Sequence, residues 1–233
     1  MGARVLQHPF SGFRTQKQYA IDQARHDWVL CLDADERISP ELREAIVAAR
    51  VGGFDSAGYQ FPRLSNYFGR FLRHGNAYPD RVMRLFDRRR GGWNGNREVH
   101  EAASVDGPVK TLAGNLIHFP YRSLEQQLSK TQRYARMMAE DEFARGGRAH
   151  WAKLVFAPAW RFWRGYVLRL GFLDGWRGLI YAYVRDNYVR QKSIMLWLLQ
   201  QGEDVSDPPR PINAAVPPTR ARPDNHPRSH PDE

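Results

Sequence analysis

The stretch WVLCLDADE, residues 28–36, decides the fold expected for this chain of 233 residues. Five apolar residues, 28–32, precede three carboxylates within four positions, a pattern typical of a short buried strand that ends at a polar mouth. A strand buried on both faces belongs in the middle of a mainly parallel sheet, where binding sites form at the carboxyl ends of the strands. We therefore expect residues 33–36 at the opening of such a site.

The carboxylates of this stretch include an Asp-x-Asp pair, Asp33 and Asp35. Such a pair can hold a divalent cation through oxygen ligands, and the cation can bind a diphosphate. The alternative is that the carboxylates only end the strand, because so short a motif also occurs by chance. A calcium-binding EF-hand loop is disfavoured, since Arg37 and Ile38 stand where it needs an acid and a glycine.

Composition narrows the class of protein. A hydrophobic content of 42% allows one domain with a substantial core, perhaps with a subdomain. The formal charge of +10 predicts attraction to phosphates, whether of nucleotides, nucleic acid or anionic lipid. The single cysteine, Cys31, excludes an internal disulfide and favours a reducing compartment, the cytoplasm. Neither a membrane span nor an export signal is indicated by any apolar run.

The segments around the acidic stretch alternate in type. Residues 15–25 are good helix formers and predict a helix before the strand. Residues 39–41, Ser-Pro-Glu, supply an N-cap, a first-turn proline and an acid for a second helix that ends at the glycines 52–53. Residues 58–119 form short aromatic and β-branched runs, which we interpret as strands and long loops. This order is typical of a doubly wound α/β fold.

The last third of the chain is predicted to be helical. Ser123–Gln126 is a capping box, and the helix of about six turns that it begins ends at the glycines 146–147. Residues 151–200 hold five of the seven tryptophans and eight Lys or Arg against two Asp. Residues 201–233 hold eight of the fifteen prolines and are predicted to be disordered.

The tryptophan-rich segment suggests an amphipathic helix. On a helical wheel one apolar face is shared by Phe156, Trp160, Trp163, Val167 and Leu170. Such a helix can lie in a membrane interface with its arginines reaching lipid phosphates. Ordinary packing of an aromatic stripe against the rest of the protein is the alternative.

Two further positions are candidates for chemistry. His100-Glu101 lies near the end of a predicted strand, and a glutamate there could take the proton from an attacking hydroxyl. A zinc-protease helix is excluded, because Ser104 stands where its second histidine is needed. His118 ends the run TLAGNLIHF, where a neutral imidazole can bind a metal or make a structural hydrogen bond.

The order of these segments resembles glycosyltransferase family 2, and more narrowly its bacterial branch of lipopolysaccharide-core β-1,4-glucosyltransferases. The resemblance covers residues 3–200 and is carried by SGFRTQKQYAIDQARHDWVLCLDADERISPEL, NYFGRFLRHGNAYPDRVMRLFDR, EVHEA, NLIHFPYRS and GFLDGWRGL. It implies an A-type nucleotide-sugar transferase (Rossmann-like) sheet followed by C-terminal amphipathic helices. It also implies inverting transfer of a sugar from a nucleotide diphosphate, expected to be a UDP-sugar, to a lipopolysaccharide-core or other lipid-linked glycan.

The resemblance also implies roles for individual residues. Asp33 is implied to bind the donor and Asp35 to bind the metal, Mg²⁺ or Mn²⁺, with His118 as a further ligand beside it. Glu101 matches the position of the catalytic base. Two basic residues, Lys17 and Arg84, are implied to contact the donor diphosphate or the acceptor.

The chain departs from the family pattern at its start. Members normally begin earlier, with a strand, a Lys-Asn-Glu-type loop and a second strand that hold the nucleotide. We therefore expect residues 1–120 to form an A-type domain without its usual first strands and with an exposed sheet edge. Residues 121–200 are expected to form a helical region that associates with a membrane, and residues 201–233 a tail.

Three functions are consistent with these observations. The first is a glycosyltransferase, peripheral at the inner face of the cell membrane. The second is a catalytically inactive remnant of such an enzyme, a basic module that binds membranes or polyanions. The third, nucleic-acid binding, rests only on charge and aromatic content, and we rank it last because no nucleic-acid-binding motif is present.

Overall fold

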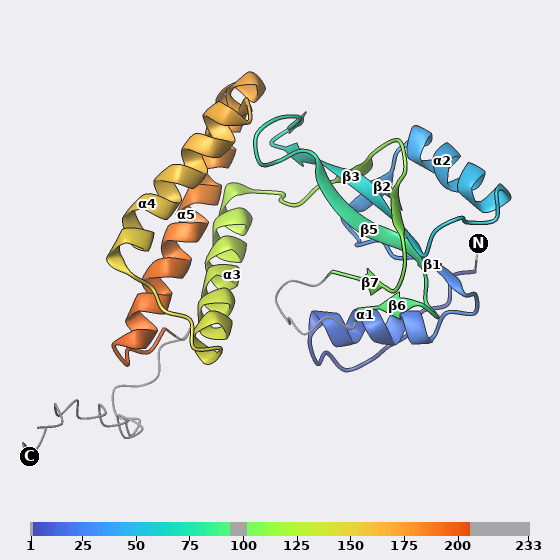
Figure 1. The fold of residues 1–233 in the computed structure, drawn as a ribbon, viewed down its shortest axis with the longest axis horizontal. Helices are drawn as coiled ribbons and strands as arrows, with labels where there is room; N and C mark the ends of the chain where they lie inside the picture. Colours follow the sequence, from blue (N-terminus) through green and yellow to red (C-terminus); the bar gives the residue numbers. More distant parts are fainter. Residues whose placement is uncertain (1, 94–101, 206–233) are drawn as a thin grey trace, which may run out of the picture.

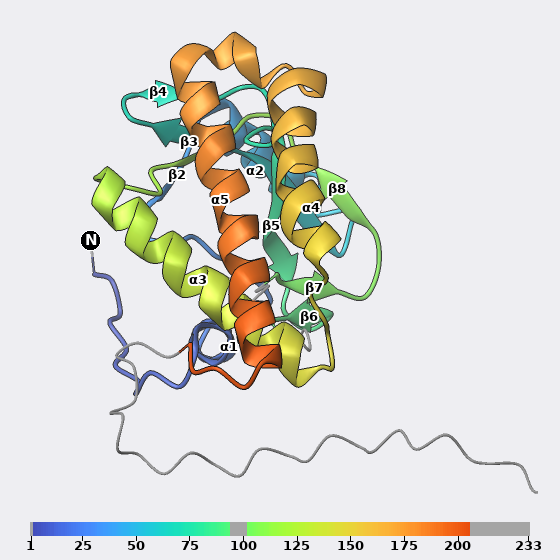
Figure 2. The ribbon, with the colours of Figure 1, turned by 90° about the vertical axis from the view of Figure 1, so that its left-hand side faces the viewer.

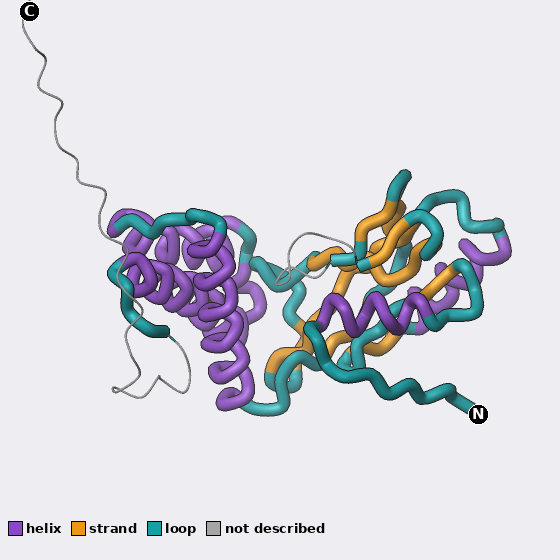
Figure 3. Tube along the Cα trace, turned by 90° about the horizontal axis from the view of Figure 1, so that it is seen from below, coloured by secondary structure: helices purple, strands orange, loops and turns teal. Residues whose placement is uncertain are grey.

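The structure is a computed structural model that describes residues 2–93 and 102–205. A mixed sheet with two flanking helices forms one part of the molecule, and three long helices form the other (Figures 1 and 3). The elements, in chain order, are α1 (Phe13–Asp22), β1 (Trp28–Leu30), β2 (Glu36–Ile38), α2 (Pro40–Val51), β3 (Gly58–Tyr67), β4 (Arg70–Phe71), β5 (Asp80–Asp87), β6 (Gly91–Gly92), β7 (Ser104–Val105), β8 (Val109–Thr111), β9 (Leu116–His118), α3 (Leu124–Ala144), α4 (Trp151–Trp163), a π-helical turn (Arg164–Leu168), a 3₁₀ turn (Gly171–Asp174) and α5 (Gly175–Gln200).

The main sheet has seven strands, five of them in the order β1-β5-β3-β9-β2. Strand β3 is its longest member, pairing antiparallel with β5 and β4 and parallel with β8 and β9. Strands β6 and β7 form a separate two-stranded ribbon. The predicted α/β fold is confirmed as a mixed parallel and antiparallel sheet followed by C-terminal helices.

The place expected for the Trp28 strand is wrong. Strand β1 has only three residues, lies at one end of the described sheet and pairs antiparallel with β5 alone. Because no other described strand covers that edge, Leu30 and Leu32 stay 38% and 41% exposed. The three acidic residues also do not all lie in a loop after β1, because Glu36 is the first residue of β2.

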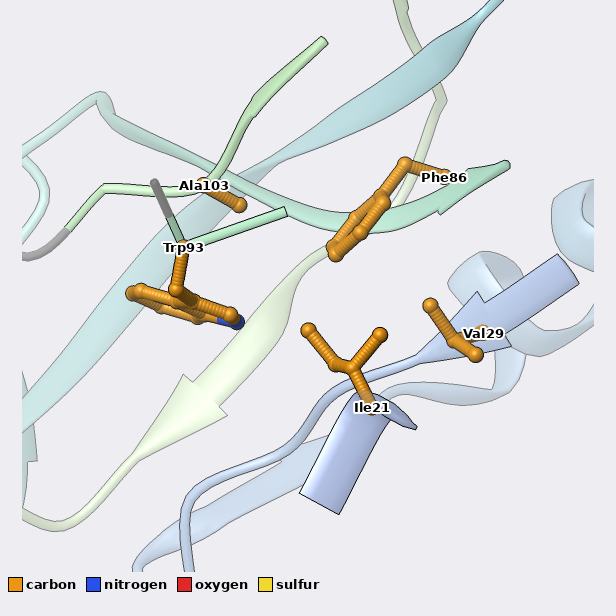
Figure 4. Packing of buried hydrophobic residues seen from close by; sticks show 5 residues of the cluster. All are labelled: Ile21, Val29, Phe86, Trp93 and Ala103. Carbon is orange, nitrogen blue, oxygen red and sulfur yellow. The ribbon is translucent and has the colours of Figure 1, made fainter. Parts of the chain in front are cut away.

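The two helices of the sheet region form where the sequence predicts them. Ser39 Oγ accepts a hydrogen bond from the Leu42 backbone N–H, which caps α2, and Leu42 is fully buried beneath it. Helix α1 packs through Ile21 into a core that joins β1, β5 and the β6–β7 ribbon (Figure 4). The buried members of this core are Ile21, Val29, Phe86, Trp93 and Ala103.

Helices α3, α4 and α5 lie side by side, with α5 in the middle, and we call them the helical layer (Figure 2). The predicted cap of α3 is confirmed, because Ser123 Oγ accepts from the Gln126 backbone N–H. The Gln126 side-chain oxygen accepts a hydrogen bond from the Arg122 backbone N–H instead of from that of Ser123. None of the described helices combines the length and the apolar content that crossing a bilayer requires.

The predicted single amphipathic helix through residues 156–170 is wrong. Helix α4 contains Pro158 and ends at Trp163, and a π-helical turn continues from it only as far as Leu168. Leu170 has a left-handed backbone (φ 59°), which ends helical geometry before α5 begins. Val167 and Leu170 therefore do not extend the stripe of α4.

The helical layer is held to the sheet region by the loop after β4. The Asp174 carboxylate accepts hydrogen bonds from the backbone N–H groups of Arg73 and His74, and it contacts His74 Nδ1 at 3.0 Å. The Tyr67 hydroxyl donates to Gln127 Oε1 of α3 at 2.8 Å. The motif GFLDG of the sequence thus fixes the position of the helical layer on the hairpin β3–β4.

Candidate active site

Asp33 is paired with two cations in the turn after β1. Its Oδ1 lies 3.0 Å from Lys17 Nζ of α1, and its Oδ2 lies 2.6 Å from Arg84 Nη2 of β5. Burial raises the pKa of Asp33, but the positive charges of Arg84 and Lys17 outweigh this and hold it below its usual value. Asp33 is therefore a carboxylate at pH 7 whose oxygens are already occupied by partners on other elements.

Glu36 extends this pairing into the protein interior. Its fully buried Oε1 lies 2.6 Å from Arg84 Nη2 and 3.5 Å from Arg63 Nη1, and its Oε2 accepts the Asp33 backbone N–H. Arg63 in turn donates to Asp80 at 2.6 Å. The acidic turn is thus fixed in shape by the buried guanidinium group of Arg84 on β5 and the partly buried one of Arg63 on β3.

Asp35 points away from this network toward His118. Its Oδ2 lies 3.5 Å from His118 Nε2, and its carbonyl oxygen accepts the Phe119 backbone N–H at 2.9 Å. Because Glu36 pairs with His118 between the antiparallel strands β2 and β9, the preceding residue, Asp35, lies beside His118. Asp35 has no other side-chain partner among the described residues, and its side chain is 39% exposed.

His118 has the protonation state that a metal ligand needs. Burial lowers its pKa, and the positive charge of Arg63 lowers it further, so the imidazole is neutral at pH 7. Nδ1 lies 3.1 Å from Ser65 Oγ. The tautomer that donates from Nδ1 to Ser65 leaves the Nε2 lone pair on the side of Asp35.

A cavity of about 710 Å³ opens beside the acidic turn. It lies between β5, α1 and α3, and its charged lining residues are Lys17, Asp33, Arg63, Arg81 and Arg84. Trp93 and Tyr134 add aromatic rings to its wall. Four cations against one carboxylate make this cavity suited to an anionic ligand with rings or sugar faces to stack.

The structure brings five of the six predicted site residues to one end of the sheet. Lys17 and Arg84 meet at Asp33, and Asp35 meets His118 at the other side of the same turn. The Arg84 Nη2 atom is occupied by carboxylates, while its buried Nε has no hydrogen-bond partner in the described part of the chain. The predicted base, Glu101, and the neighbouring His100 lie outside the described residues.

Three residues with a place in this site were not predicted. Arg63 pairs with the buried Glu36, Ser65 orients His118, and the Trp93 ring stacks under Lys17 Nζ at 4.4 Å. An arginine inside the apolar run GYQFPRL was a signal, because a buried charge needs a partner. Ser65 and Trp93 gave no such signal, since their partners, His118 on β9 and Lys17 on α1, lie far away in the sequence.

Known proteins resemble this chain over most of its length. Residues 1–105 match the model of glycosyl transferase family 2. The chain is 27% identical to the lipopolysaccharide core biosynthesis glycosyltransferase LpsC of Rhizobium meliloti over 197 residues, which cover 81% of this chain and 73% of that protein. It is 28% identical to an uncharacterized glycosyltransferase of Rickettsia typhi, over 79% of this chain and 68% of that protein.

The similarity to both relatives covers more of the chain than the family match does and therefore extends into the helical region. The family model alone spans α1, the acidic turn, β3 and β5, the elements that carry four of the predicted site residues. The chain is therefore a glycosyltransferase that is similar to glycosyl transferase family 2 over residues 1–105.

Proposed function

We propose that this glycosyltransferase moves a sugar, with inversion, from a nucleotide diphosphate donor, a UDP-sugar, to a lipopolysaccharide-core or other lipid-linked glycan. We further propose that it works as a peripheral protein at the inner face of the cell membrane. The observation that carries the proposal is the pair of Asp35 and His118 on one side of the acidic turn, while Asp33 on its other side lines a cavity rich in cations. The name of the Rhizobium relative supports the choice of acceptor.

The residues present fit a divalent cation of the Mg²⁺ or Mn²⁺ type. Asp35 offers a carboxylate without a cationic partner among the described residues, and His118 offers a neutral imidazole nitrogen 3.5 Å from it. No group of three or more such side chains gathers in the described ranges, so the diphosphate and water would complete the ligands. When bound, the cation would offset the charge that gathers on the leaving diphosphate.

The other site residues would act on the acceptor and the donor. In an inverting displacement a base takes the proton of the acceptor hydroxyl, and we assign this role to Glu101 on the basis of the sequence. Asp33 and Lys17 form one wall of the cavity, where the lysine can contact a phosphate of the donor. Arg84 holds Asp33 and Glu36 in place and is itself one of the residues that line the cavity.

Calorimetric titration tests the proposal. We expect UDP and UDP-glucose to bind the full chain in the presence of Mn²⁺ and to bind at least about tenfold more weakly without it. Asp35→Ala should remove this dependence on Mn²⁺, because it deletes the carboxylate ligand. Asp55→Ala is the matched control, since Asp55 is an exposed carboxylate that pairs with Lys110 away from the site.

The outcomes separate the two candidate functions. Equal binding by Asp35→Ala and Asp55→Ala would contradict the assigned metal site. Folded protein that binds no sugar nucleotide, with or without Mn²⁺, would favour the second candidate, a catalytically inactive module that binds membranes or polyanions. The net charge of +10 is the observation that keeps this candidate in view.

A further inference from the structure

Exposed apolar side chains gather at the turn between α4 and α5. We call five of them the apolar corner, and each is between 45% and 58% exposed. They are Leu168, Leu170, Phe172, Leu173 and Trp176. A contiguous group of large apolar side chains on the surface of one turn is unusual for a soluble protein and marks a contact surface.

The backbone of the turn requires these side chains to face outward. Gly171 and Gly178 pack so closely that a Cβ on Gly178 would lie 2.0 Å from the Gly171 carbonyl oxygen. Asp174, the only polar side chain of the 3₁₀ turn, points inward to the loop after β4. The interior of the corner is therefore filled by backbone, and Leu170 keeps a left-handed conformation although its side chain packs into no described core cluster.

The charges around the corner are positive. Arg164, Arg169 and Arg177 lie within or next to it, and the Arg177 guanidinium stacks on the Trp176 ring at 4.2 Å. Residues 151–200 contain two carboxylates, Asp174 and Asp186, and the side chain of each is only 8% exposed. The surface thus presents apolar groups and guanidinium groups without an exposed acid.

The corner also lies close to the candidate active site. Arg177 Nε donates to the carbonyl oxygen of Phe68, at the tip of the hairpin β3–β4 (Figures 1 and 2). On the same hairpin the Phe71 ring packs edge-on against Phe119 at 6.4 Å, one residue after His118. One short hairpin therefore joins the corner to the proposed metal ligand.

We propose that the apolar corner docks on a bilayer that contains anionic phospholipid, with its side chains among the acyl chains and its arginines on the phosphates. Exposed aromatic and leucine side chains beside arginines, with the acids turned inward, are the chemistry of a membrane interface. This surface, more than the face of α4, would then set the distance between the bilayer and the site. The inference rests on the proposed function only for the lipid-linked acceptor, because docking requires no sugar transfer.

Sedimentation with vesicles tests the docking. The full chain should sediment with vesicles of phosphatidylglycerol and phosphatidylcholine, and less with phosphatidylcholine alone or at high salt. Phe172→Ser combined with Leu173→Ser should lower this binding at least about tenfold, because two apolar side chains no longer leave water. The matched control is Val47→Ser with Val51→Ser on α2, which removes two exposed apolar side chains elsewhere and should change nothing.

Two further measurements keep the proposal falsifiable. Quenching of tryptophan fluorescence by brominated lipid should fall in the conservative variant Trp176→Phe, which keeps an aromatic side chain at the corner. Equal vesicle binding by the wild type and the corner variant would overturn the proposal. A concentration-dependent dimer that the corner variant loses would also overturn it, in favour of a second copy of the chain. UDP binding measured in the same samples tests the proposed function separately, since its loss alone would leave the docking intact.

Discussion

The sheet region buries charged side chains at its candidate site, whereas the helical layer leaves large apolar side chains exposed. At the acidic turn, Glu36 and Arg84 are buried together, with side chains 0% and 6% exposed. In the helical layer, Trp160 and Trp163 remain more than half exposed, while the two acids of residues 151–200, Asp174 and Asp186, are turned inward. Burial of charges requires partners in exact positions, so the first region is suited to hold a reacting site, and the second is suited to make contact with a surface.

The largest expected effect comes from breaking the buried charge network. Arg84→Met leaves Glu36 buried without its nearest cation and should lower the free energy of unfolding by about 3–5 kcal/mol. Urea denaturation measures this change. The matched control is Lys110→Met, because Lys110 and its partner Asp55 have side chains that are 55% and 64% exposed, so their pair lies at the surface. Equal losses of stability in both variants would show that the buried charge network contributes no more to stability than an exposed ion pair does.

The next effect tests the contact between the two regions. Asp174→Ala removes the acceptor for the backbone N–H groups of Arg73 and His74 and should cost about 2–3 kcal/mol in urea denaturation. Asp174→Asn retains one acceptor oxygen and should recover part of the loss. Asp141→Ala, which breaks an exposed i,i+4 pair with Arg145, should change stability by less than about 0.5 kcal/mol. A loss no larger than that of Asp141→Ala would mean that other contacts hold the helical layer in place.

Much of the sheet region could be predicted from local patterns. A few neighbouring residues are enough to indicate the cap of α2 at Ser39 and the strands β3 and β5, and the structure confirms all three. The edge position of β1 could not be predicted, because an apolar run does not show how many strands will pair with it. The break of the helix at Leu170 was missed for a similar reason, since a helical wheel assigns residues to a face without testing whether the helix continues.

The sequence named residues of the candidate site but did not show which of them pair with one another. Asp33 and Asp35 were found as one motif, yet they face opposite ways, one to Lys17 and Arg84 and the other to His118. That division depends on strands β5 and β9, which lie about fifty and eighty residues further along the chain. No spacing rule within the motif contains this information.

The smallest effect concerns the hydrogen bond that joins the tip of β3 to α3. Tyr67→Phe leaves the buried Gln127 amide oxygen without its donor and should cost about 1–2 kcal/mol at pH 7. Urea denaturation of both proteins across a range of pH measures this difference. Tyr183→Phe is the control, because the Tyr183 side chain is 66% exposed and its removal should cost nothing at any pH.

The same bond gives a signed prediction for high pH. Burial raises the pKa of Tyr67 to about 12, whereas an unfolded tyrosine titrates near pH 10. A raised pKa in the folded protein means that the contribution of Tyr67 is complete below about pH 10 and is lost as the pH rises through about 12. The stability advantage of the wild type over Tyr67→Phe should therefore shrink above about pH 10, while the other buried tyrosines affect both proteins equally and cancel. If the difference in unfolding free energy between the wild type and Tyr67→Phe stayed constant up to pH 12, the Tyr67 hydroxyl would be open to water. The contact between the sheet region and the helical layer would then be looser than the buried network at the site.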